Sequence, residues 1–332
     1  MDQMRRGALR RIGYGVAGGM AGGLAWSTAA AQSAAGTSWP SRPVRVVYPY
    51  PPGGTGDVLV RIITERLSKA WGQPVVVENR PGAGGMIGTE AVARSAPDGY
   101  TLLVAITGLV QMPVVTKAPF DPVRDFAPIA EIGTTHWALA VQPDLPVRNV
   151  ADFVAYAKQL GKPLPFGTYS PATAPHIQIA LLAQAQGFEP TFVHYRGEAP
   201  LLQDLLGRQI GCGALAATTV QKQSAKLRAL AVNGNARSPL LPDVPTFAEA
   251  GFTGLEQPGF IGMLAPAGTP AALVERISQD VIQALADPET KARLDDMGIL
   301  LRPGTAAQFS QTVRNEFDYW TKAVRTTGVR LE

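Results

Sequence analysis

Segments typical of β-strands alternate with segments typical of helices along most of this chain. The β-branched run at residues 44–48 predicts a strand, and apolar residues at helical spacing predict a helix over residues 57–71 that ends at Gly72. Further strands are predicted at residues 75–78, 101–106, 165–168, 191–195, 210–215, 227–232 and 259–264, and further helices at residues 86–95, 150–160, 174–186, 198–206, 270–286, 288–297 and 305–326. This alternation predicts an α/β fold in which mostly parallel sheets carry helices on both faces.

The chain of 332 residues is long enough for two domains, and two apolar extended segments resemble crossings between them. Residues 137–141 and 227–232 are both strand-like and are flanked by polar turns. With these segments as hinges, the predicted division is lobe one at residues 40–141 and 232–332, and lobe two at residues 142–231. The single cysteine, Cys212, excludes an internal disulfide, and its place in a predicted strand indicates a core residue.

The first 31 residues have the three parts of an export signal. Four arginines and one acid lie within residues 1–11, an apolar run covers residues 12–26, and Ala29 and Ala31 fit the small-residue rule for cleavage. This pattern predicts a signal peptide over residues 1–31 and a periplasmic protein, exported by either the general secretory or the twin-arginine route. The alternative is an N-terminal tail with no targeting role.

Charge and motifs exclude several classes of function. The leader holds three of the four net positive charges, so the rest of the chain gives no basis for nucleic-acid binding. Signatures of serine hydrolases, P-loop proteins, zinc proteases and thiol redox proteins are absent, and His136, His176 and His194 lack metal-ligand spacing. We therefore expect no enzyme activity, no cofactor and no metal. The enzyme alternative is a hydrolase that pairs His176 with Ser170 or Thr173.

A glycine-rich loop at residues 48–57 joins the first predicted strand to the first predicted helix. Helix N-termini carry unpaired N–H groups and the positive end of the helix dipole, and glycine lets these groups approach a ligand. The loop therefore predicts an anion site, and its candidate ligand-binding residues are Tyr50, Pro52, Gly53, Gly54, Thr55 and Asp57. Because Asp57 would repel an anion, its expected task is to accept backbone N–H groups as an N-cap. The alternative is a tight structural turn.

Further candidate residues follow other predicted strands. They are Gly84 and Gly85 in the loop at residues 81–86, Thr107 after the third strand, Tyr169, Ser170, Thr173 and His176 in the loop at residues 167–176, and Tyr195 and Arg196 before the helix at residues 198–206. Open α/β sheets bind ligands at the carboxyl ends of their strands, so we expect these loops to converge. The structural alternatives are packing for the glycines and His176, and an N-cap for one hydroxyl. For Arg196 the alternative is an ion pair with Glu198 or Asp204.

Five runs form a recognisable set, at residues 48–57, 77–85, 97–102, 240–246 and 264–270. The first two read YPYPPGGTGD and VENRPGAGG. Together the runs resemble the Bug family, the substrate-binding proteins of tripartite tricarboxylate transporters, over nearly all of the chain after the leader. The resemblance implies a Venus-flytrap fold of the type II periplasmic-binding class, no enzyme activity, and a carboxylate ligand held by backbone N–H groups of residues 52–55. It also implies contacts from the loop at residues 168–176 and from residues 195–197 in the opposite lobe.

The third loop departs from the family pattern that the resemblance implies. Ser170 and Ala172 stand at its usual glycine positions, and Ala174 stands at its second hydroxyl. These changes predict a less polar pocket in lobe two, suited to a monocarboxylate or an aromatic acid. The implied partners are a small organic anion and membrane permease subunits or a sensor, and we expect a monomer that binds no nucleic acid. The alternative is a sensor-only binding module.

Overall fold

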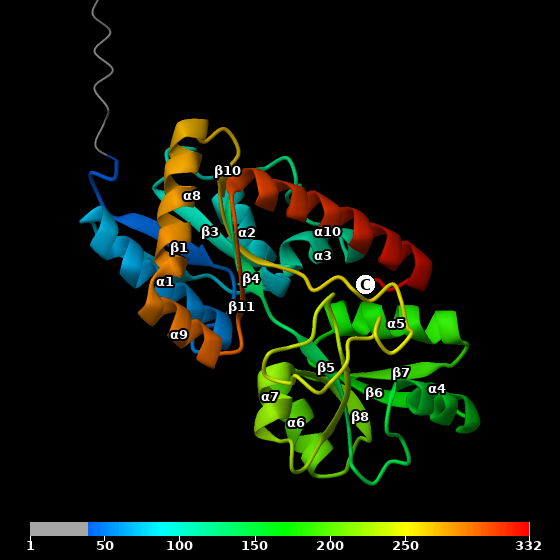
Figure 1. The fold of residues 1–332 in the computed structure, drawn as a ribbon. Helices are drawn as coiled ribbons and strands as arrows, with labels where there is room; N and C mark the ends of the chain where they lie inside the picture. The colour runs from blue at the N-terminus through cyan, green and yellow to red at the C-terminus, as the bar shows by residue number, and fades with distance from the viewer. Residues whose placement is uncertain (1–38, 332) are drawn as a thin grey trace, which may run out of the picture. The chain divides into compact units, whose positions relative to one another are not determined.

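The computed structural model describes residues 39–331. This part of the chain contains two β-sheets (Figure 1). The first sheet has the order β11-β4-β10-β3-β1-β2 and contains β1 (Val44–Tyr48), β2 (Val75–Asn79), β3 (Thr101–Ile106), β4 (Phe126–Thr134), β10 (Ile261–Pro266) and β11 (Leu300–Gly304). The second has the order β7-β6-β8-β5-β9 and contains β5 (Trp137–Val141), β6 (Leu164–Thr168), β7 (Pro190–His194), β8 (Cys212–Ala216) and β9 (Arg228–Val232). The predicted signal peptide, residues 1–31, lies outside the described residues. No helix within residues 39–331 is both long enough and apolar enough to cross a membrane.

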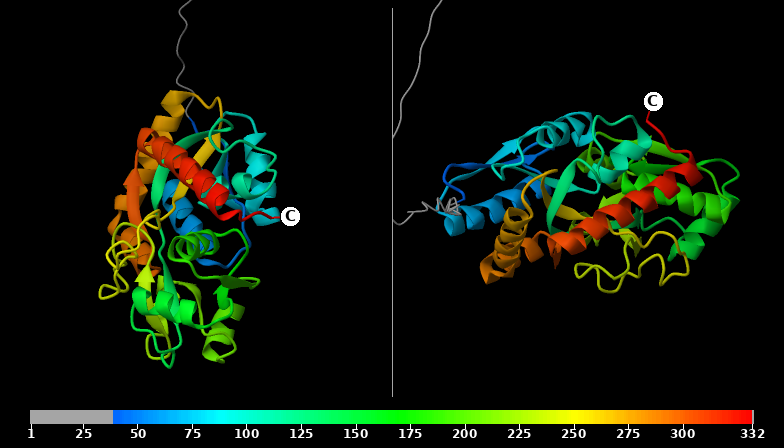
Figure 2. Two further views of the ribbon diagram at one scale, coloured as in Figure 1. Left: turned by 90° about the vertical axis from the view of Figure 1, so that its right-hand side faces the viewer. Right: turned by 90° about the horizontal axis from the view of Figure 1, so that it is seen from above.

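Helices pack on both faces of each sheet. On the first sheet, α1 (Thr55–Trp71), α8 (Ala271–Ala286) and α9 (Pro288–Asp296) share one face, and α2 (Met86–Ala93), α3 (Gly108–Val115) and α10 (Ala306–Thr327) share the other. On the second sheet, α4 (Val150–Gln159) and α5 (Ala174–Gln186) lie on one face, and α6 (Glu198–Leu206) and α7 (Ala217–Lys222) lie on the other. Helix α10 also packs against α5, so it contacts the helical layer of the second sheet (Figure 2). The predicted α/β class is confirmed.

The sheets are mixed, which corrects the prediction that they are mostly parallel. In the first sheet β1 runs parallel to β2 and β3, whereas β10 runs antiparallel to β3 and β4, and β11 runs antiparallel to β4. In the second sheet β6 runs parallel to β7 and β8, whereas β5 runs antiparallel to β8 and β9. The parallel pairs belong to segments joined by crossover helices. The antiparallel pairs involve β4, β5, β9 and β10, which flank the two passages of the chain between the sheets.

The two strands predicted to cross between lobes belong to the second sheet, in which β5 is a central strand and β9 is an edge strand. All residues from Trp137 to Val141 are buried, because β5 lies between β8 and β9 and helices cover both faces of the sheet. The chain passes between the sheets at residues 135–136 and again over residues 233–260. The apolar composition of β5 matches its burial within the sheet, and the predicted division into lobes stays a prediction.

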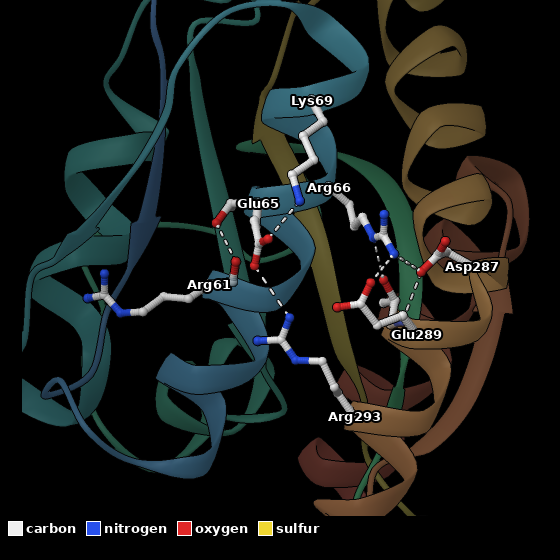
Figure 3. A network of polar contacts seen from close by, with 9 residues as sticks. Arg61, Glu65, Arg66, Lys69, Asp287, Glu289 and Arg293 are labelled. Carbon is white, nitrogen blue, oxygen red and sulfur yellow. Dashed lines mark hydrogen bonds and ion pairs between the residues drawn. The ribbon is translucent and has the colours of Figure 1, made fainter.

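Charged side chains join α1 to α9 and to the residue that follows α8 (Figure 3). Arg66 pairs with Asp287 and donates to Oε2 of Glu289 at 2.8 Å. Glu65, one residue earlier on α1, accepts from Arg293 at 3.3 Å. Asp287 is also the N-cap of α9, so one carboxylate both begins that helix and binds it to α1.

Candidate ligand-binding cavity

A cavity of about 800 Å³ opens at the carboxyl ends of strands from both sheets. The lining residues at these strand ends are Tyr48 of β1, Ile106 of β3, Tyr169 after β6, Tyr195 after β7 and Ala216 of β8. These strands form the parallel part of each sheet. Ligands of open α/β folds bind at this edge of a sheet.

Nine of the fifteen predicted ligand-binding residues line the cavity: Tyr50, Thr55, Gly84, Thr107, Tyr169, Ser170, Thr173, Tyr195 and Arg196. The other six do not line it: Pro52, Gly53, Gly54, Asp57, Gly85 and His176. The structure thus brings residues of all the predicted loops to one space. Their roles in binding stay predictions.

Four helices begin at the cavity wall. Their first residues, Thr55 of α1, Gly108 of α3, Ala174 of α5 and Glu198 of α6, all line the cavity. In none of the four does a side chain cap the helix N-terminus with a hydrogen bond. The wall therefore presents free backbone donors and the positive ends of helix dipoles, an arrangement that favours an anion.

The start of α1 shows these free donors most clearly. Gly54 is the N-cap, and within residues 39–331 the N–H groups of Thr55 and Gly56 have no hydrogen-bond partner. We call these two groups the α1 amides. A Cβ at Gly56 would lie 1.8 Å from Oη of Tyr48, so only glycine lets the tyrosine hydroxyl pack against the start of the helix.

Asp57 is buried inside the loop and is not the N-cap that the sequence predicted. It lies in the first turn of α1, where its Oδ2 accepts from the N–H of Gly53 at 3.0 Å and its Oδ1 accepts from Asn79 at 2.8 Å. Burial raises its pKa, but hydrogen bonds from Arg61, Gly53 and Asn79 outweigh burial and hold the pKa below its ordinary value. The carboxylate therefore fixes the loop while its charge is balanced by Arg61.

Aromatic rings form much of the remaining wall, and some of their polar atoms are already engaged. The rings of Tyr48 and Tyr50 lie 5.2 Å apart, and burial raises the pKa of both phenols. The hydroxyl of Tyr195 donates to Oδ2 of Asp204 at 2.8 Å, so only its ring is available to a ligand. Similarly, the hydroxyl of Thr107 accepts from the N–H of Phe260 at 2.9 Å and holds α3 to β10.

The third loop contains one structural histidine. His176 Nδ1 accepts from the N–H of Ala172 at 2.9 Å, and its ring lies 4.2 Å from that of Phe192. Burial, with a smaller effect of His194, lowers the pKa of His176 to about 4. Thr173, the N-cap of α5, donates its hydroxyl to the carbonyl of Ser170 and accepts no hydrogen bond from a helix N–H. Within residues 39–331 no hydrogen bond joins His176 to either hydroxyl, so the pair needed by the hydrolase alternative is not formed.

Two charged residues, Arg196 and Glu198, line the cavity together with the titratable His136. Glu198 accepts from the N–H of Ala216 at 2.5 Å, and burial raises its pKa although this hydrogen bond opposes the shift. Arg196 makes no ion pair within the described part of the chain. The alternative of an ion pair with Glu198 or Asp204 is therefore not observed, and its guanidinium is free for a ligand anion.

Cys212 is a core residue, as predicted. It is buried, its thiol contacts the carbonyl of Pro165 at 3.3 Å, and burial raises its pKa to about 12. A thiol that does not ionise near neutral pH has no nucleophilic role.

One wall of the cavity, formed by α3, was not predicted from the sequence. Gln111 and Met112 of this helix line the cavity, and so do Trp137, Pro258 and Phe260 from other elements. Because Pro113 lies inside α3, the helix has no clear sequence signal, and its residues were not candidates. The predicted features near this wall are the glycine run at residues 82–85, where Gly84 packs against Met112, and Thr107, the N-cap of α3.

Comparison with known proteins identifies the class and then the family. Residues 59–329 match the family model of the tripartite tricarboxylate transporter family receptor. Protein BugT of Bordetella pertussis is 31% identical over 300 residues, which cover 89% of this chain and 92% of BugT. A UPF0065 protein of Cupriavidus necator is 34% identical over 293 residues, which cover 87% of this chain and 89% of the relative.

Solved structures agree with this match. The periplasmic binding protein BugD is 32% identical with a TM-score of 0.74, covering 89% of this chain and 100% of BugD. The R. palustris protein Rpa4515, solved with adipate, is 32% identical with a TM-score of 0.76, covering 88% of this chain and 99% of its own. MatC from Rhodopseudomonas palustris, solved with bound malate, is 30% identical with a TM-score of 0.74, covering 86% of this chain and 100% of its own.

The fold is therefore that of a two-lobed periplasmic solute-binding protein. Within that class, the chain belongs to the tripartite tricarboxylate transporter receptor family, which includes the Bug proteins. The predicted resemblance and the predicted fold are confirmed. Members of this family are receptors that bind solutes.

Proposed function

We propose that this protein captures a small organic carboxylate in the periplasm and delivers it to a tripartite tricarboxylate-type transporter, without catalysing a reaction. The observation that carries this proposal is the convergence of four uncapped helix N-termini on one cavity. Backbone amides in that arrangement favour a carboxylate. Adipate and malate, the ligands named for two relatives, are both small carboxylates, which supports the same ligand class.

In the proposed complex the carboxylate binds the α1 amides. Tyr50 contributes its ring from the first sheet, and Tyr169 and Tyr195 contribute theirs from the second. Arg196 lies at the second sheet's side of the cavity, where its unpaired guanidinium attracts an acid. The aromatic rings in the cavity wall favour a ligand with an apolar body, such as an aromatic or short-chain acid. Tight binding of citrate with no binding of any monocarboxylate would contradict this choice of ligand.

Closure of two lobes is the proposed mechanism of capture. We assign the lobes to the two sheets, with the hinge at residues 135–136 and 233–260. Gln178 of α5 donates to the carbonyl of Gln257 at 3.1 Å, and Gln257 donates to Glu316 of α10 at 2.6 Å, so partly buried hydrogen bonds cross this hinge. A ligand that touches both lobes stabilises the closed state, and the equilibrium shifts toward it. The closed form would then bind the permease subunits.

Thermal unfolding of the mature protein against a panel of organic acids tests the proposal. A true ligand present at about 100 times its Kd stabilises the folded state by about 2.7 kcal/mol, because it binds that state alone. We expect a carboxylic acid to raise Tm and the matching primary amide to have no effect. The acid should also be recovered unchanged. A panel without any stabilising acid would contradict the proposal, and turnover that disappears in His176→Ala would favour the hydrolase alternative.

A further inference from the structure

One buried amide in the cavity wall lacks a hydrogen-bond partner. Gln111 lies on α3, is 5% exposed and lines the cavity. Its side-chain Nε2 makes no hydrogen bond with any residue from 39 to 331. Nearly all buried polar groups in folded proteins have a partner, so this exception requires an explanation.

The other buried side-chain amides show how this protein normally satisfies such groups. Gln142 donates to two carbonyls, each at 3.0 Å, and Asn233 accepts from the N–H of Trp137 at 2.8 Å. Gln178 accepts from the indole N–H of the same Trp137 at 2.8 Å and donates to Gln257. These three amides are held by the protein itself. Asn233 also lines the cavity, and Gln111 differs from it because no residue from 39 to 331 is a partner for its Nε2.

The cavity wall that Gln111 lines also contains apolar residues and a further hydroxyl without a partner. Met112 follows it on α3, and Phe260 and Ile106 are further apolar members of the cavity wall. At the start of the same helix, a Cβ at Gly108 would lie 2.5 Å from the hydroxyl of Tyr50, so a second polar group lies beside α3. That hydroxyl also makes no hydrogen bond within the described part of the chain. These two polar groups, both without a hydrogen-bond partner in the described residues, mark one place in the wall where a ligand atom would be recognised.

We propose that Gln111 determines which acids bind, because its amide hydrogen-bonds an oxygen atom that the ligand carries in addition to its bound carboxylate. This inference rests on the proposed function and narrows its ligand class. The favoured ligands are acids with a hydroxyl, keto or second carboxyl oxygen. An acid that lacks such an oxygen leaves the amide unpaired in the closed cavity and binds more weakly.

Calorimetric titration with matched pairs of acids tests the inference. The pairs are 4-hydroxybenzoate with benzoate, 3-hydroxybutanoate with butanoate, and adipate with hexanoate. For at least one pair, we expect the wild-type protein to bind the oxygen-bearing acid about tenfold tighter, the usual size of one hydrogen-bond difference. Gln111→Met keeps the length of the side chain and removes the amide, so its preference should fall to within about twofold. Met112→Leu, on the same helix, should keep the wild-type preference.

The unfolding temperature of the ligand-free protein gives a second, independent readout. Removing an unpaired buried amide should leave Tm of Gln111→Met unchanged or higher. A lower Tm would show that the protein satisfies the amide, and it would overturn the inference. If acids bind but Gln111→Met keeps the preference, water alone satisfies the amide, and the inference fails while the proposed function stands. If no acid binds the wild type, both fail.

Discussion

Replacing Thr55 with proline is expected to weaken carboxylate binding about ten- to a hundredfold, because it removes one of the two α1 amides. Hydrogen bonds to a charged group contribute about 1.5–3 kcal/mol each, and proline at this position has no N–H to donate. The helix itself should tolerate the change, because proline is favoured at the first position of a helix. Gly54, which precedes it, already has an extended backbone with φ −80° and ψ 168°, the conformation that a following proline requires.

Thr55→Ala is the matched control for this prediction. It removes the hydroxyl but keeps the N–H, so its affinity should stay within about threefold of the wild type. Calorimetric titration of both variants with the best acid of the panel separates the backbone from the side chain. Equal losses in the two variants would mean that the threonine hydroxyl binds the ligand. Unchanged affinity in Thr55→Pro would show that the α1 amides do not hold the carboxylate.

The free energy of unfolding is expected to depend on pH because of one buried carboxyl group, that of Glu316. Glu316 of α10 is fully buried and accepts from Gln257 and from the indole of Trp320, both at 2.6 Å. Burial raises its pKa from 4.5 to about 7, although these two hydrogen bonds and the charge of Arg302 oppose the shift. Below the ordinary pKa both the folded and the unfolded state hold the proton. Between the two values only the folded state holds it, so stability falls as pH rises through this window.

Glu316→Gln isolates this contribution because glutamine has the same shape and does not titrate. We expect the unfolding free energy of the wild type, relative to that of Glu316→Gln, to fall by about 3 kcal/mol between pH 4.5 and pH 7.5. Above pH 7.5 the difference should become constant, because Glu316 is then ionised in both states. Urea unfolding of the two proteins at matched pH values measures the difference. A difference that does not change with pH would show that the pKa of Glu316 is ordinary.

Most helices and strands could be predicted from the sequence, because the local residue patterns agree with the structure. Gly72 ends α1 in the left-handed conformation, with φ 63°, as its position before Pro74 predicted. Long amphipathic helices such as α8 and α10 begin and end within about two residues of their predicted bounds. Strand direction was not accessible, because antiparallel pairing of β10 with β3 depends on contacts between distant segments.

Four elements had no usable local signal. Proline lies inside α3, β4 and β11, at residues 113, 128 and 303, and proline normally argues against a helix interior or a central strand. Helix α7 is a short segment with two threonines, which favour other conformations. Packing in the tertiary structure overrides these local preferences.

The candidate cavity was predictable at the loops that follow the parallel strands and was missed at the wall formed by α3. The glycine-rich loop at residues 48–57 predicts a helix start with free backbone amides, and Thr55 of this loop lines the cavity. By contrast, Gln111 could not be chosen as a candidate from the sequence. Its place in the cavity wall and its unpartnered amide depend on how α3 packs in the tertiary structure. His176 shows the opposite case, because a histidine near a helix start turned out to bind the loop backbone.

A crystal structure of the protein with the best acid of the panel would show directly whether the α1 amides hold the carboxylate. We expect the carboxylate oxygens to lie within hydrogen-bond distance of the N–H groups of Thr55 and Gly56, either directly or through one ordered water. A structure in which the acid binds elsewhere and these two N–H groups face bulk solvent would contradict it.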